Sequence, residues 1–148
     1  AASLQLGAII GGASENNQKH LYEFGKNIGI AFQIQDDYLD AFGNPDKFGK
    51  QVGGDILANK KTFLWIHALA VANEQQREEL NSLMHYNVED KVAKVLKIYA
   101  DCNVAEWAST LKEKYYNQAI QHLEEVAVSQ MRKSELEKLA RYLLQRES

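Results

Sequence analysis

The sequence predicts an all-α protein in which helices pack as a bundle. Apolar side chains recur every three or four positions through residues 103–129, which is the spacing of one helix face. No stretch alternates apolar and polar residues as a half-buried strand does. From Asp55 to the end of the chain there is neither glycine nor proline, the two residues that most disfavour a helix.

The expected helices follow one another through mostly short connections. They span residues 2–13, 17–42, 57–72, 74–85, 88–100, 103–129 and 134–146. Residues 43–56 form the clear irregular connection, because they hold four glycines and the only proline. Asn103 with Glu106, and Ser134 with Glu137, fit a capping box, in which two side chains satisfy free amides at a helix start.

Length, composition and charge limit the class of protein. At 148 residues the chain is long enough for one domain with a hydrophobic core. Its net charge of −3 gives no basic surface for nucleic acid, and no segment approaches the roughly 20 apolar residues of a membrane span. Cys102 is the only cysteine, which excludes an internal disulfide and favours a reducing compartment. We therefore expect a cytoplasmic protein without nucleic-acid partners or stable membrane insertion.

Three aspartates in the expected helix 17–42 are the leading candidates for a functional site. Asp36 and Asp40 are four residues apart and project from one helix face, whereas Asp37 points about 100° away. Their neighbours are mostly apolar, which predicts a buried helix, and buried carboxylates are costly unless paired or bound to a metal. Lysines in and after the glycine-bearing loop add positive charge suited to a phosphate, which would favour Mg²⁺. The alternative is a solvated acidic surface with solvated lysines.

The aspartates belong to an ordered set of motifs. The set reads Phe32-Gln33, Asp36-Asp37, Asp40, Gly49-Lys50, Gly54-Asp55 and Lys60. A short acidic pattern alone has low specificity. The whole set in this order resembles the second aspartate-rich region of the trans-prenyl diphosphate synthases, the farnesyl and geranylgeranyl diphosphate synthase family. The resemblance extends over essentially the whole chain and implies a helical trans-prenyltransferase, or isoprenoid synthase, fold.

The family's earlier motifs have no counterpart in this sequence. The first aspartate-rich motif and the arginines after it are absent, as is the Lys-Thr pair that the family has before its second aspartate-rich region, and no arginine precedes Arg77. The resemblance therefore implies that residues 1–148 are the C-terminal part of one helical domain, of which this chain carries a partial fold without the N-terminal part. It also implies that this chain is inactive alone and that the full-length protein is a homodimer.

The resemblance gives each residue of the aspartate helix a role. Asp36 would bind Mg²⁺ directly, Asp40 directly or through water, and Asp37 would support them. In the family Phe32 lines the cavity near the reacting carbons, and Gln33 lies near the developing allylic cation.

The lysines would contact diphosphate. Lys50 matches the family's loop lysine, and Lys60 matches the next one, with Lys61 as an adjacent competitor. Asn59 and Phe63-Leu64 stand where the family often has glycine before this lysine and proline after it.

Two further sets of residues have simpler interpretations. Gly25 and Gly29 precede Gln33 at four-residue intervals, which we interpret as close helix packing, with room for a prenyl chain as the alternative. The histidines show no zinc-like spacing, so we expect surface or packing roles for His20, His67, His85 and His122.

The implied activity is the Mg²⁺-dependent condensation of an allylic diphosphate with isopentenyl diphosphate in isoprenoid biosynthesis. A second hypothesis is a noncatalytic helical subunit or binding module that retains one metal-binding wall. A terpene cyclase fits poorly, because its second metal motif mixes Asn or Asp with Ser or Thr and Glu. A di-iron carboxylate bundle fits worse still, because the sequence has no Glu-x-x-His pair.

Overall fold

The computed structural model describes residues 14–43, 53–86, 89–126 and 130–145. Within these ranges every regular element is a helix, which confirms the all-α prediction. The helices are α2 (Glu15–Phe42), α4 (Gly54–Leu57), α5 (Phe63–Val71), α6 (Glu74–His85), α7 (Lys91–Asp101), α8 (Val104–Glu124) and α9 (Gln130–Gln145). The helix expected at 2–13 lies outside the described residues. No helix of the described part is long and apolar enough to cross a membrane.

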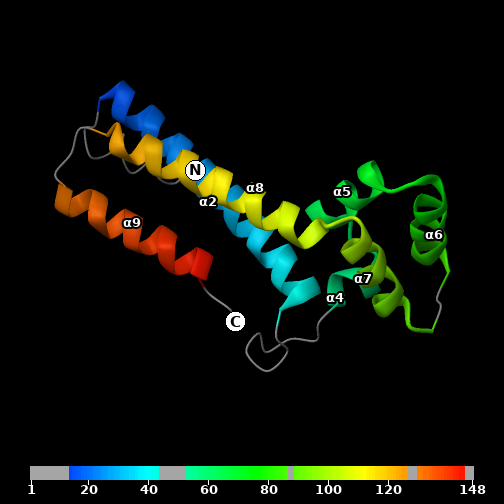
Figure 1. The fold of residues 1–148 in the computed structure, drawn as a ribbon. Coiled ribbons are helices and arrows are strands. Elements are labelled where there is room, and N and C mark those ends of the chain that lie inside the picture. Colours follow the sequence, from blue (N-terminus) through cyan, green and yellow to red (C-terminus); the bar gives the residue numbers. More distant parts are fainter. Residues whose placement is uncertain (1–13, 44–52, 87–88, 127–129, 146–148) are drawn as a thin grey trace. The chain divides into compact units, whose positions relative to one another are not determined.

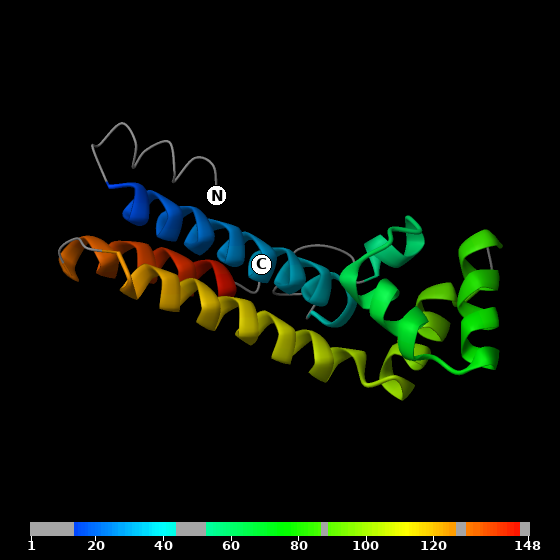
Figure 2. The same cartoon turned by 90° about the horizontal axis from the view of Figure 1, so that it is seen from above.

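The described residues fall into two compact units, and α2 and α8 each contribute to both. The first unit holds the residues up to Gln33 and those from Leu111 onward. In it the N-terminal part of α2, the C-terminal part of α8 and α9 lie side by side (Figures 1 and 2). Their shared faces bury one apolar cluster, made of Phe24, Ile28, Ala119, Leu123 and Ala140.

The second unit runs from Ile34 to Thr110 and contains the aspartates. Helix α7 is its central element, because α4, α5 and α6 all pack against it. Apolar side chains from each of these helices are almost completely buried, including Leu64, Leu80 and Val95. Ile34, in the part of α2 that belongs to this unit, is also fully buried.

The boundary between α4 and α5 differs from the sequence prediction. A single helix was expected over 57–72, but the structure places a turn between α4 and α5. Asn59 has a left-handed φ of 56° and Thr62 is extended, with ψ of 170°, so neither continues a helix. Thr62 instead caps α5, because its side chain accepts a hydrogen bond from the Trp65 amide at 3.1 Å.

Other helix ends show which local signals were informative. The prediction for 74–85 matches α6, whose start carries a full capping box between Asn73 and Gln76. Helix α9 begins at Gln130, so the predicted start at Ser134 was wrong and that residue lies inside the helix. Asn103 does meet Glu106, but it has a left-handed φ of 56° and donates through Nδ2 to the carboxylate at 2.9 Å.

Candidate functional site

The aspartates at the end of α2 differ in burial. The side chains of Asp37 and Asp40 are buried, with 2% and 9% of their surface exposed, whereas Asp36 is half-buried. The predicted burial is therefore confirmed for Asp37 and Asp40, and Asp36 is only partly buried. Buried carboxylates need partners, and the structure supplies them from the next two helices.

Asp40 holds the start of α4. Its Oδ2 accepts a hydrogen bond from the Asp55 amide at 2.8 Å, and its backbone oxygen accepts one from the Gly53 amide at 2.6 Å. Gly53 has a left-handed φ of 89°, and a Cβ there would lie 2.6 Å from a methyl carbon of Val92. Glycine is required at this position for both reasons, which explains part of the glycine-rich segment.

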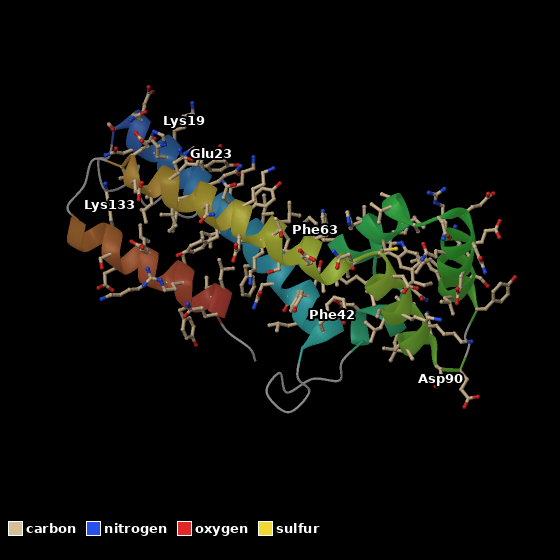
Figure 3. The ribbon with its side chains drawn as sticks, viewed as in Figure 1. Lys19, Glu23, Phe42, Phe63, Asp90 and Lys133 are labelled. Carbon is tan, nitrogen blue, oxygen red and sulfur yellow. The ribbon has the colours of Figure 1, made fainter. Side chains whose placement is uncertain are left out.

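Asp37 holds the start of α5. Its Oδ2 accepts a hydrogen bond from the Phe63 amide at 3.2 Å, and its Oδ1 lies 3.7 Å from the Lys60 ammonium. The same ammonium lies 3.8 Å from Oδ2 of Asp55. In Figure 3, Phe63 marks the start of α5, and Phe42 marks the end of α2. A carboxylate at a helix N-terminus is favourable, because the first amides and the helix dipole present positive charge there.

Tyr99 lies against these acids in the core. Its ring is 2% exposed, and burial raises the pKa of its hydroxyl above the usual value. The negative charges of Asp37 and Asp55 raise this pKa further, while a hydrogen bond with the Thr62 side chain opposes the shift. Tyr99 is therefore a neutral hydrogen-bonding group at all physiological pH values.

A buried lysine supports the turn that carries Lys60. The ammonium of Lys91, a residue with 7% exposure, donates a hydrogen bond to Oδ1 of Asn59. Asn59 holds the left-handed position of the turn, and the Lys60 amide that follows donates to the Asp55 carbonyl at 2.9 Å. The position of Lys60 thus depends on contacts with α4 and α7.

These groups surround a small cavity. Its volume is about 20 Å³, and its polar lining includes Asp37, Asp40, Asp55, Lys60, Lys91 and Tyr99. A cavity of this size holds about one water molecule. Within the described part of the chain, this is where three acidic side chains and two ammonium groups converge.

The other predicted site residues have different positions. Asp36 does not line the cavity. Phe32 is half-buried and Gln33 exposed, on the part of α2 that belongs to the first unit. Lys50 lies outside the described residues, and Lys61 is exposed. A Cβ at Gly29 would meet nothing within 4 Å among the described residues, so the close packing predicted for this glycine is not observed there.

Sequence reasoning did not select several residues of the cavity. Thr62 had a usable signal, because a threonine directly before the apolar run 63–71 is a typical helix cap. Asn59 also had one, since asparagine tolerates a left-handed backbone better than most residues. Lys91 and Tyr99 had none, because their contacts join segments distant in sequence.

The donor chemistry fits a hard cation only in part. Carboxylate oxygens suit Mg²⁺, which takes one or two of them and fills its shell with phosphate and water. Among the described residues, no group of three or more His, Cys, Asp or Glu side chains could hold a metal ion. The described aspartates could therefore supply only part of a Mg²⁺ coordination shell.

The fold defines a class, the all-α isoprenoid synthases. The crystal structure of a geranylgeranyl pyrophosphate synthetase from Pyrococcus horikoshii matches with a TM-score of 0.90 at 30% identity, over 99% of this chain and 44% of that one. A geranylgeranyl pyrophosphate synthase from Corynebacterium glutamicum, crystallised with isoprenyl diphosphate and magnesium, matches with a TM-score of 0.81 at 29% identity, over 95% of this chain and 41% of that one.

The chain belongs to the polyprenyl synthetase family, whose sequence profile matches residues 1–102. A short chain isoprenyl diphosphate synthase of Methanothermobacter thermautotrophicus is 36% identical over 147 residues. That match covers 99% of this chain and 45% of the relative. The chain thus spans about half the length of the curated relatives it matches.

Proposed function

We propose that this chain is part of an enzyme that condenses an allylic diphosphate with isopentenyl diphosphate in isoprenoid biosynthesis. The observation that supports this most is the convergence of Asp37, Asp40 and Asp55 with the Lys60 ammonium at one small cavity. The family membership and the ordered motifs around these residues support the same reaction. In this proposal the chain supplies one wall of the catalytic site.

The three aspartates of α2 have different parts in this proposal. Asp36, which is half-buried and does not line the cavity, binds Mg²⁺ directly. Asp40 contributes directly or through water while it anchors the Asp55 amide. Asp37 orients the others and the start of α5, because its two oxygens already meet the Phe63 amide and Lys60.

The lysines bind diphosphate in this proposal. Lys60 is suited to it because its side chain is 48% exposed and its ammonium lies between two carboxylates, at 3.7 and 3.8 Å. An incoming diphosphate would share that ammonium with Asp37 and Asp55. Lys50 is proposed as the second cationic contact on the basis of its motif alone.

When bound, Mg²⁺ would supply Lewis-acid stabilisation of the negative charge on the departing diphosphate. The chain's own residues hold fixed charges around that group, so that little reorganisation is needed as charge develops. Gln33, which is exposed on α2, is proposed to face the allylic carbons, and Phe32 to line their cavity.

Three further properties belong to the same proposal. The residues of this chain carry no first aspartate motif, so we expect no turnover from the 148-residue chain alone. The full-length protein is proposed to be a homodimer, to be tested by analytical ultracentrifugation. Cytoplasmic localisation is proposed from the single cysteine and the reducing compartment that it favours.

A noncatalytic helical subunit is the second candidate. It is suggested by one observation, that these 148 residues contain the second aspartate motif without the first. Such a subunit would keep the aspartate wall for binding and would not support turnover in any form of the protein.

A turnover assay separates the two candidates. The complete product of the gene and the 148-residue chain are each incubated with isotopically labelled isopentenyl diphosphate and a C5, C10 or C15 allylic diphosphate. Mg²⁺ is either supplied or removed with a chelator. We expect prenyl products from the complete protein with Mg²⁺ only, and none from the 148-residue chain. A folded complete protein that makes no product would support the noncatalytic subunit instead.

A further inference from the structure

Two histidines meet in the first unit, far from each other in sequence. His20 of α2 and His122 of α8 have their Nδ1 atoms 3.1 Å apart, although 102 positions separate them. Their ring centroids are 5.3 Å apart, with an angle of 41° between the planes. Both side chains are half-buried, so the pair is reachable from solvent. Their contact joins α2 to α8, which agrees with the packing role expected for the histidines.

The pair is held in place by the helices that carry it. Phe24 lies one turn after His20, and Leu123 follows His122 directly. Both belong to the buried cluster that joins α2 to α8 and α9. Folding therefore already holds the two rings together. Because they are preorganised, a ligand that binds both loses less free energy to ordering them. Lys19 and Glu23, labelled in Figure 3, flank His20 on α2.

The distance between the two nitrogens fits two kinds of contact. In the absence of a ligand, one Nδ1–H donates to the lone pair of the other Nδ1. The distance also fits two ligands of one metal ion. With metal–nitrogen bonds of about 2.0–2.1 Å, adjacent nitrogens lie about 3.3 Å apart in a tetrahedral shell and about 2.9 Å apart at a right angle. The observed 3.1 Å lies between these values.

We propose that His20 and His122 form a two-histidine site for a transition-metal ion of the Zn²⁺, Ni²⁺ or Cu²⁺ class, with water completing its shell. Imidazole nitrogen suits these ions, and the hard Mg²⁺ ion prefers oxygen. The ion takes the place of the shared hydrogen. The Nδ1–H ring changes to its Nε2–H tautomer, so both Nδ1 lone pairs bind the metal without net loss of a proton. The bound ion then links α2 to α8.

This site is separate from the proposed prenyl-transfer function, because neither histidine belongs to the ordered motifs that run from Phe32 to Lys60. Its test uses the full 148-residue chain without an affinity tag, washed with a chelator. Zn²⁺ is titrated by calorimetry in the presence of excess Mg²⁺, which occupies sites that prefer hard oxygen ligands. The variants are His20→Gln and His122→Gln. The matched control is His85→Gln, because His85 is exposed on α6 and belongs to the second unit.

We expect the wild-type chain and His85→Gln to bind Zn²⁺ alike, and each single substitution in the pair to weaken binding by about tenfold or more. Zn²⁺ should also raise the melting temperature of the wild-type chain and leave that of the pair variants almost unchanged. No binding by the wild-type chain, or equal binding by the pair variants, would overturn the proposal.

Ring nitrogen spectra of the wild-type chain give a readout that does not depend on how the variants fold. Addition of Zn²⁺ should shift the Nδ1 resonances of His20 and His122, and Mg²⁺ should not. Shifts confined to His67 or His85 would equally overturn the proposal.

Discussion

Oδ2 of Asp40 accepts a hydrogen bond from the backbone amide of Asp55 at 2.8 Å, which ties the aspartate helix to the start of α4. An Asp40 backbone contact with Gly53 reinforces the same junction at 2.6 Å. A residue proposed to act on the metal therefore also has a structural task. Its substitutions must be chosen so that the two effects can be separated.

Two substitutions, Asp40→Ala and Asp40→Asn, separate the structural role of Asp40 from its proposed role at the metal. Alanine leaves the Asp55 amide without its side-chain acceptor and should lower the free energy of unfolding by about 1–3 kcal/mol. Asparagine keeps an oxygen that can accept this hydrogen bond, so Asp40→Asn should lower the free energy of unfolding clearly less than Asp40→Ala. Urea denaturation followed by circular dichroism measures both. Equal destabilisation by the two variants would mean that the hydrogen bond to α4 contributes little.

Tyr99 should make stability fall at alkaline pH. Burial raises the pKa of its hydroxyl, so the folded protein holds the proton after the unfolded chain has released it, above pH of about 10. The stabilisation is fully present below that pH and is lost as pH rises, by at most about 1.4 kcal/mol per pH unit.

The check compares Tyr99→Phe with Tyr142→Phe, because Tyr142 is 66% exposed. Denaturation midpoints of the wild type and Tyr142→Phe should fall steeply above about pH 10, and that of Tyr99→Phe less steeply. Parallel curves for all three proteins would show that the Tyr99 hydroxyl is not protected by burial.

The turn before Lys60 should depend on the backbone conformation of Asn59. Its left-handed φ of 56° is strained for alanine and relaxed for glycine, while both substitutions remove the hydrogen bond from Lys91. Asn59→Ala should therefore be less stable than Asn59→Gly by about 1 kcal/mol. Thermal melting measures the difference, and a more stable alanine variant would contradict this backbone geometry.

Much of the fold was predictable from local sequence, and the exceptions have local causes. Helix α6 was predicted at its observed bounds, and its start carries a local capping box between Asn73 and Gln76. The helix expected over 57–72 is interrupted after Leu57, where Asn59 has a left-handed backbone and Thr62 caps the start of α5. Ser134 fitted a capping pattern, yet α9 begins before it, since such patterns also occur inside helices.

Some residues of the candidate site were also predictable from local sequence, and others were not. Asp37, Asp40 and Lys60 were predicted because their motif is continuous in sequence. Lys91 and the pairing of His20 with His122 were not, because their contacts depend on how distant helices pack.

Magnesium should bind this chain weakly without diphosphate. Among the described residues, no group of three or more His, Cys, Asp or Glu side chains is arranged to hold a metal ion, and Mg²⁺ gives up its water reluctantly. Calorimetry with MgCl₂ should give little heat, and inorganic diphosphate should strengthen binding. Tight binding without diphosphate would indicate a complete protein site and contradict the shared shell.

Asp36→Ala and Asp37→Ala in the complete gene product test the proposed aspartate wall most directly. Turnover with an allylic diphosphate and isopentenyl diphosphate is measured beside the free energy of unfolding. Asp36→Ala should lower turnover by about two to three decades with little loss of stability, as should Lys50→Ala. Asp37→Ala should lower turnover less and stability more, because its carboxylate is buried against Phe63 and Lys60. Near-normal turnover of folded Asp36→Ala and Lys50→Ala proteins would contradict the account.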